Sequence, residues 1–172
     1  MSLPQPASDP IVVGAVLGTG ASSAVVDLYT RRIPNALTLS VAAFGVLLAA
    51  SGRGPLTVTQ TLTGFAVGLA LMLPGHLIGA TGAGDVKLFA AIGTLLGPAG
   101  IATAFVYTAL AGGVLALLIA ARRRLLRQTV ERAAALVRTG GGNVGEIERS
   151  VTNRFAYAPA IAAGALAAAL GI

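Results

Sequence analysis

Long apolar segments alternate with short polar or basic segments along the chain. The apolar segments span residues 11–27, 35–50, 62–80, 86–97, 101–121 and 155–172. A membrane-spanning helix needs roughly 20 predominantly apolar residues, and most of these segments approach that length. The pattern therefore predicts an all-α, polytopic membrane protein with about six transmembrane helices.

The fourth segment, 86–97, is short for a full crossing and is followed at once by Gly97-Pro98. Proline removes a backbone donor and clashes with the preceding turn, so we predict that the helix breaks at this point. One unbroken helix from 86 to 121 would be too long for a single crossing. Two crossings that meet at Gly97-Pro98 are therefore the favoured prediction.

Composition supports a membrane location for the whole chain. Of its 172 residues, 55% are hydrophobic and only 10% are charged, and the mean hydropathy is +0.83. Soluble domains carry about 25% charged residues, so this chain has too few polar groups to cover a soluble surface. The length accommodates the predicted spans but no sizeable soluble domain beside them. We therefore predict a single membrane-embedded domain over residues 1–172.

The residues that commonly bind metals are scarce. The chain contains no cysteine and a single histidine, His76. The lack of cysteine excludes disulfides, a thiol nucleophile and cysteine-based zinc sites. A lone histidine does not build a metal site, so His76 is predicted to have a boundary or packing role. We expect no metal ion and no cofactor.

Twelve basic residues against six acidic ones raise the question of nucleic-acid binding. No platform of basic and aromatic residues accompanies the charge, so no nucleic-acid partner is expected. In a polytopic membrane protein, arginines instead mark cytoplasmic loops. Arg31 and Arg32 follow the first span, and the loop 122–154 holds eight more arginines. With six spans, both loops lie on the cytoplasmic side of the inner membrane, and both termini lie outside.

The arginine-rich loop 122–154 has an apolar pattern of its own. Leu126, Val130, Ala133 and Val137 recur at helical spacing, opposite arginines. Such a pattern is typical of an amphipathic helix that lies on the inner leaflet of the membrane. A stop-transfer cluster that continues the fifth span fits equally well, so both interpretations stay open.

Two of the three aspartates lie where predicted spans meet the cytoplasm. Asp27 ends the first span and Asp85 begins the fourth, so both reach the same membrane face; Asp9 is expected to be solvated. Each alone has an ordinary interpretation as a boundary residue or a helix cap. The positive N-terminal end of a helix favours Asp85, but Asp27 stands at a C-terminal end, which disfavours an anion. The position of Asp27 therefore calls for a further reason.

A pair of carboxyl groups supplies that reason. Two neighbouring carboxyls do not both ionise cheaply, so they share a proton. One of them then accepts a proton from water while the other donates to a carbonyl oxygen, which is general acid–base hydrolysis of a peptide. The helix ends suggest Asp85 as the base and Asp27 as its protonated partner. Because such a pair titrates as a unit, the assignment of the base stays open.

The stretch GATGAGDVK, which precedes the fourth span, is as rich in glycine as a phosphate-binding loop. A Walker loop requires Gly-Lys-Ser/Thr, but Gly84 is followed by Asp85. A dinucleotide fingerprint requires a third glycine at the position of Lys87. Neither phosphate motif fits. We predict instead that these glycines adopt positive φ or allow a bound peptide to approach closely.

Three places in the chain resemble the type IV prepilin leader peptidases, which belong to the wider group of GxGD intramembrane aspartyl proteases. Residues 82–87, GAGDVK, reproduce the GxGDxK signature of that family. Asp27 with the following LYTRRIPN resembles the first catalytic aspartate and its downstream stretch. The segment YAPAIAAGAL near the end is similar to the final, proline-containing helix of the family.

The resemblance implies an aspartic endopeptidase that removes the short basic leader of pilin precursors at the cytoplasmic membrane surface. Asp27 and Asp85 would be its catalytic pair, and Gly82 and Gly84 would shape the site for the substrate. Lys87 matches a recurring family position; a substrate contact and a lipid phosphate contact are both open. The expected partners are a prepilin and the lipid bilayer. The sequence identifies neither the prepilin nor the oligomeric state.

The chain departs from the larger members of that family. They carry an N-terminal cytoplasmic insertion with paired cysteines, and they also N-methylate the mature pilin. Here only seven residues separate Asp27 from Asn35, and cysteine is absent. Methyl transfer is therefore not expected. The chain looks like the short form associated with tight-adherence (Flp-type) pili.

Two other functions compete with a peptidase. A small proton- or cation-coupled transporter would use the same aspartates, but transport sites favour the bilayer midplane and repeated halves. A non-catalytic scaffold for pilus assembly does not need an aspartate pair.

Phe155 and Tyr157 are expected to be aromatic anchors at the membrane interface, and Pro159 is expected to kink the last helix.

Overall fold

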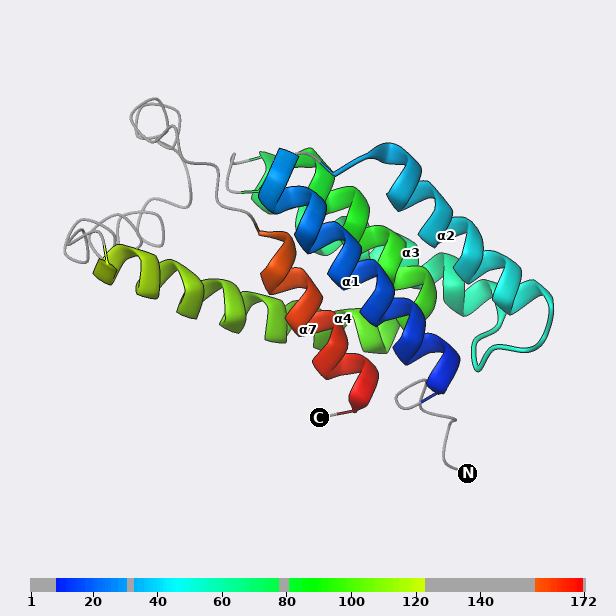
Figure 1. The fold of residues 1–172 in the computed structure, drawn as a ribbon. Coiled ribbons are helices and arrows are strands. Elements are labelled where there is room, and N and C mark those ends of the chain that lie inside the picture. Colours follow the sequence, from blue (N-terminus) through cyan, green and yellow to red (C-terminus); the bar gives the residue numbers. More distant parts are fainter. Residues whose placement is uncertain (1–8, 31–32, 78–80, 123–156, 172) are drawn as a thin grey trace.

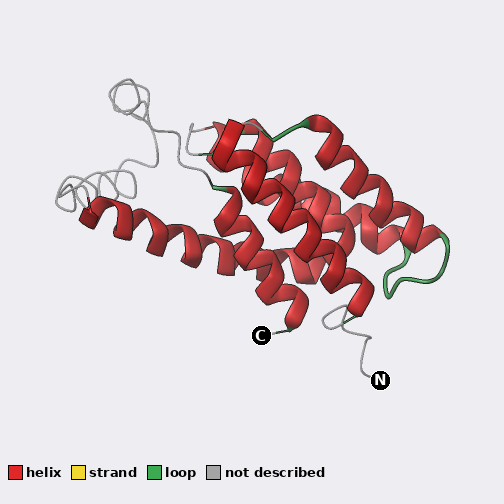
Figure 2. Cartoon of the chain, in the orientation of Figure 1, coloured by secondary structure: helices red, strands yellow, loops and turns green. Residues whose placement is uncertain are grey.

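Five α-helices make up the regular structure in the part of the chain that the computed structural model describes (Figures 1 and 2). That part comprises residues 9–30, 33–77, 81–122 and 157–171. The helices are α1 (Pro10–Thr30), α2 (Asn35–Ala50), α3 (Val58–Leu77), α4 (Ala83–Arg122) and α7 (Ala158–Leu170). The all-α prediction is confirmed. The predicted amphipathic segment within 122–154 lies almost entirely outside the described residues.

Three stretches of these helices are long and apolar enough to cross a membrane. They are Pro10–Tyr29, Val58–Leu77 and Ala83–Leu115. The helices α2 and α7 are apolar but shorter. Large apolar side chains, among them Leu17, Leu47 and Leu62, are exposed on α1, α2 and α3, as expected of surfaces that face lipid. The count of six crossings stays a prediction.

A break at Gly97 divides α4 into two halves, which correspond to the fourth and fifth apolar segments of the sequence. Gly97 has φ 69° and ψ −179°, a conformation that is essentially restricted to glycine, and Pro98 follows it. The predicted break at Gly97-Pro98 is confirmed. Beyond the break α4 takes a different direction, and its yellow-green end extends away from the other helices (Figure 1).

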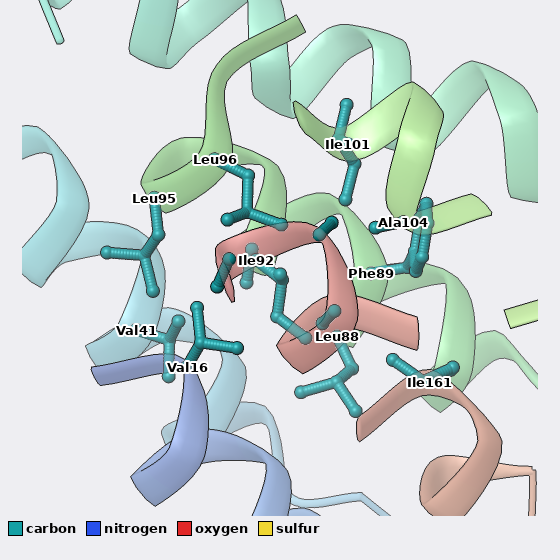
Figure 3. Packing of buried hydrophobic residues seen from close by; sticks show 14 of the residues in the cluster. Val16, Val41, Leu88, Phe89, Ile92, Leu95, Leu96, Ile101, Ala104 and Ile161 are labelled. Carbon is teal, nitrogen blue, oxygen red and sulfur yellow. The ribbon is translucent and has the colours of Figure 1, made fainter. Parts of the chain in front are cut away.

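The half of α4 before the break is the centre of the molecule. Its apolar side chains are almost completely buried on all sides, including Leu88, Phe89, Ile92, Leu95 and Leu96. Residues of four other elements surround them, with Val16 of α1, Val41 of α2 and Ile161 of α7 visible in Figure 3. A helix that is apolar all round is typical of a buried position. The short segment 86–97 is therefore a core helix with neighbours on every face.

Small residues let neighbouring helices approach each other closely. Gly64 of α3 lies against Gly93 and Gly97, and a Cβ added at Gly64 would come within 2.8 Å of the Gly97 Cα. In the same way, Gly20 of α1 lies against Ala162 of α7, where an added Cβ would be 2.9 Å from the alanine Cβ. Contacts of this kind are common between membrane helices, because dispersion forces there depend on close backbone packing.

Candidate active site

Asp27 lies near the C-terminal end of α1 and is only 7% exposed. Its Oδ2 accepts a hydrogen bond of 3.4 Å from the backbone N–H of Ala158, the first residue of α7. The N-terminal end of a helix carries partial positive charge and unpaired N–H groups, both of which favour a carboxylate. The N-terminus of α7 thus offsets the unfavourable position of Asp27 on its own helix. This compensation joins residues 131 positions apart, which the sequence pattern did not predict.

Asp85 lies in the first turn of α4 and is 9% exposed. Its Oδ2 accepts a hydrogen bond of 3.2 Å from the backbone N–H of Gly82, the residue that precedes the helix. An acidic side chain that reaches back to the N–H before its own helix resembles one half of a capping box. Asp85 therefore stabilises the start of α4 locally, whatever else it does.

α1 ends, and α4 and α7 begin, at one end of the bundle (Figure 1). Asp27 lies near that end of α1 and Asp85 in the first turn of α4. The charges of the two carboxylates act on each other. Their helices nevertheless pack against each other only slightly, because α1 packs mainly against α7. The relative position of the two aspartates therefore depends on the elements between them.

The glycines beside Asp85 provide space and do not use positive φ. Among the described residues, positive φ occurs at Gly52, Gly97 and Gly171, so the first of the two predicted uses does not apply at Gly82 or Gly84. The second, close approach of a bound peptide, stays a prediction. A Cβ added at Gly84 would lie 3.2 Å from the Cβ of Ile33. A Cβ at Gly82 would lie 3.1 Å from the Oδ2 of Asp85. The glycines let the first turn of α4 come close to the connector that follows α1.

Lys87 contacts the start of α2 from the next turn of α4. Its Nζ donates a hydrogen bond of 3.1 Å to the side-chain Oδ1 of Asn35, the first residue of α2. Lys87 is exposed, and its long apolar stem lets the charged end reach the edge of the bundle. This hydrogen bond therefore links the GAGDVK stretch to the asparagine of the Ile-Pro-Asn stretch. A contact of Lys87 with substrate stays a prediction.

The family of the chain follows from comparison with known sequences. The sequence profile of the type IV leader peptidase family matches residues 14–117. This chain belongs to that family. The match includes both Asp27 and Asp85 and ends within α4, so α7 lies outside it. Comparison with curated proteins and with solved structures gives no significant match.

Family membership, together with the apolar helices, makes the chain a membrane protein of a protease family with a prepilin-like substrate. Among the residues that the structure describes, no group of three or more histidine, cysteine, aspartate or glutamate side chains is arranged to hold a metal ion. His76, in the last turn of α3, lies 3.0 Å through its Nδ1 from the carbonyl oxygen of Thr81. It links the end of α3 to the segment that leads into α4.

Tyr157 borders the site, which the sequence did not indicate. It immediately precedes Ala158, the donor to Asp27, and the charge of Asp85 acts on it. Its ring packs over Gly112 of α4, where an added Cβ would be 2.8 Å from the phenol oxygen. The expectation of an interface anchor was based on residue type alone. The position of Tyr157 depends on how α7 packs against both halves of α4.

The structure corrects one further expectation and gives a capping role to another residue. Pro159 does not kink α7, because the helix begins at Ala158 and the proline falls in its first turn, where its missing N–H costs no hydrogen bond. Asp9 is not simply solvated. Its Oδ1 accepts hydrogen bonds from the N–H groups of Ile11 and Val12, at 2.9 and 3.3 Å, and so caps α1.

Proposed function

We propose that this leader peptidase removes the leader of Flp-type prepilins, with Asp27 and Asp85 as a general acid–base pair. The observation that carries the proposal is the meeting of two buried carboxyl groups, from α1 and α4, at one end of the bundle. Buried carboxyls that interact with each other are characteristic of catalytic pairs. No observation on the described residues favours the transporter alternative.

In the proposed reaction, a water molecule lies between the two carboxyl groups and the scissile carbonyl of the leader. One carboxylate takes a proton from the water, whose oxygen attacks the carbonyl carbon, while the other carboxyl donates its proton to the carbonyl oxygen. Collapse of the tetrahedral intermediate breaks the C–N bond, and the leaving amine takes a proton from the pair. Gly82 is exposed beside Asp85 and leaves room for the peptide backbone.

Asp85 is the base in this proposal, because the start of its own helix favours the anion. The contact of Asp27 with the start of α7 also favours an anion at Asp27, so the two carboxyl groups differ less in their preference for the charged form. The dependence of cleavage rate on pH distinguishes the roles, since the acidic limb reports protonation of the base. We expect residual cleavage by Asp85→Asn to lose the acidic limb and that by Asp27→Asn to keep it. The opposite result would reverse the assignment.

The site faces the cytoplasm in this proposal, at the surface of the inner membrane. Support comes from the arginines of the two loops that the positive-inside rule assigns to that side. A prepilin leader is short and basic and also lies at the cytoplasmic surface, so enzyme and cleavage point would meet without a change of membrane side.

Co-expression with a cognate prepilin tests the function. Leader removal, followed by gel shift, should occur with the wild type and fall by about 10²- to 10⁴-fold in Asp27→Asn and Asp85→Asn. Asp9→Asn is a matched control, because it changes an aspartate at the other end of α1 and asparagine caps a helix equally well. Processing that persists in both site variants would exclude the aspartate mechanism.

A further inference from the structure

The positions of the two aspartates relative to each other depend on other helices that lie between α1 and α4. Direct packing between α1 and α4 is slight, whereas α2 and α7 both pack well against α4. On one side, the N–H of Ala158 joins α7 to Asp27. On the other side, the connector after Asp27 leads into α2, whose first residue is Asn35. Ile33 and Asn35, which lie between α1 and α2 in the chain or at the start of α2, both contact the first turns of α4.

Two contacts on this second side flank Asp85 in the sequence. Gly84 packs against Ile33, and Lys87 donates its hydrogen bond to Asn35. Only the second is a directional, charge-assisted interaction, which is the stronger type of hydrogen bond. It joins residues 52 positions apart, Lys87 on α4 and Asn35 on α2.

We propose that Lys87 is a positioning residue, which holds the first turns of α4 against Asn35 and thereby fixes Asp85 relative to Asp27. This inference rests on the proposed function of the aspartate pair. Lys87 does not act on Asp85 directly, because side chains two residues apart on a helix do not face each other. Its effect passes through Asn35 at the start of α2, a helix that packs against α4 and also contacts α1.

A contact with lipid phosphate is the competing explanation for a lysine at this edge of the bundle. It makes a different demand on Asn35, since a lipid contact needs the ammonium group of Lys87 and no amide partner. Replacing Asn35 while Lys87 is kept therefore separates the two explanations.

The test is a double-mutant cycle on the full-length protein in detergent, with a purified prepilin as substrate. The variants are Lys87→Met, Asn35→Leu, the double variant and Asn35→Asp. We expect each of the first two to lower kcat about tenfold with KM nearly unchanged, which is the loss of a hydrogen bond to a charged group. The double variant should be no slower than the slower single variant. Asn35→Asp keeps the acceptor and should retain the wild-type kcat.

Arg53→Met is the matched control for loss of one positive charge, because Arg53 lies in the loop after α2, away from the aspartates. It should leave kcat unchanged. Thermal unfolding in detergent checks that each variant is folded. If the Lys87→Met variant does not fold, Asn35→Leu and Asn35→Asp complete the test with Lys87 intact.

A wild-type rate in Asn35→Leu, or additive losses in the double variant, would overturn the positioning role and leave the proposed function standing. A change in KM alone would also overturn it and would favour a substrate contact. Failure of the wild type to cleave the prepilin would instead contradict the proposed function, and the inference with it.

Discussion

The middle of α4 and its first turns are held in place by different kinds of contact. At the middle, Gly93 and Gly97 lie directly against Gly64 of α3, and no side chain separates the two backbones. Backbone-to-backbone packing adjusts little, because protein interiors are densely packed and leave no room for an added group. The middle of α4 is therefore a fixed point of the molecule.

The first turns of α4 add polar contacts at the edge of the bundle to the burial of Val86 and Leu88. Asp85 bonds to Gly82, and Lys87 bonds to Asn35. The bond of Lys87 is exposed, so it competes with water and contributes modestly to stability. Asp85 is therefore carried by a buried helix whose exposed edge is held by weaker contacts. Changes at the middle should then affect folding, and changes at the end should affect activity.

The largest effect on stability is expected from Gly64→Leu. The new side chain would overlap the carbonyl oxygen of Gly93 and the backbone of Gly97, so α3 and α4 must separate. We expect a loss of about 3 kcal/mol in the free energy of unfolding, typical of severe overpacking. Thermal unfolding and the yield of folded protein in detergent measure it. Gly14→Ala is the control, since nothing lies within 4 Å of its added Cβ; equal stability of both variants would contradict the fixed middle.

A smaller loss is expected from Gly97→Ala. Its φ of 69° is strained for any residue with a Cβ, and the new Cβ would lie 3.1 Å from the Leu56 side chain. We expect about 1–3 kcal/mol of destabilisation, the usual cost of such a backbone conformation. The same unfolding measurement applies, with Gly113→Ala on the other half of α4 as control, because that position is open. A Gly97→Ala variant with unchanged stability would show that the break in α4 does not require a positive φ at this residue.

The smallest stability effect, and a measurable activity effect, is expected from Gly84→Ala. The Ile33 side chain must move by a few tenths of an ångström to admit the Cβ, which shifts the first turn of α4. Cleavage should slow by about threefold, because catalysis is sensitive to small misplacements of reacting groups. The rate of leader removal is compared with that of Gly18→Ala, a glycine of α1 with open space around it. A loss of stability in Gly84→Ala without a change in cleavage rate would contradict the distinction between the middle of α4 and its first turns.

The helices themselves were largely predictable, because apolar segments and Gly-Pro breaks act within one stretch of chain. Residues 35–50 coincide with α2, and the break at Gly97 falls at the predicted place. Starts and ends were less predictable. The last segment was expected from residue 155, but α7 begins at Ala158, which changes the role of Pro159 from a kink to a first-turn residue.

The candidate site was predictable in its residue types and only partly in its arrangement. Span parity predicts Asp27 and Asp85 on one membrane face from the order of apolar segments alone. The residues that support them were not predictable, because a contact such as that of Ala158 with Asp27 depends on which helices pack together. Tyr157 was missed for the same reason.

By itself, the sequence determined a helical membrane chain with two aspartates at span ends and a glycine-rich turn beside one of them. These features follow from local hydrophobicity and spacing, which do not depend on the rest of the fold. Only the tertiary structure decided that α7 offsets the charge of Asp27 and that Lys87 reaches Asn35. Such contacts join residues 131 and 52 positions apart, and they exist only once helix packing has fixed the distances between side chains.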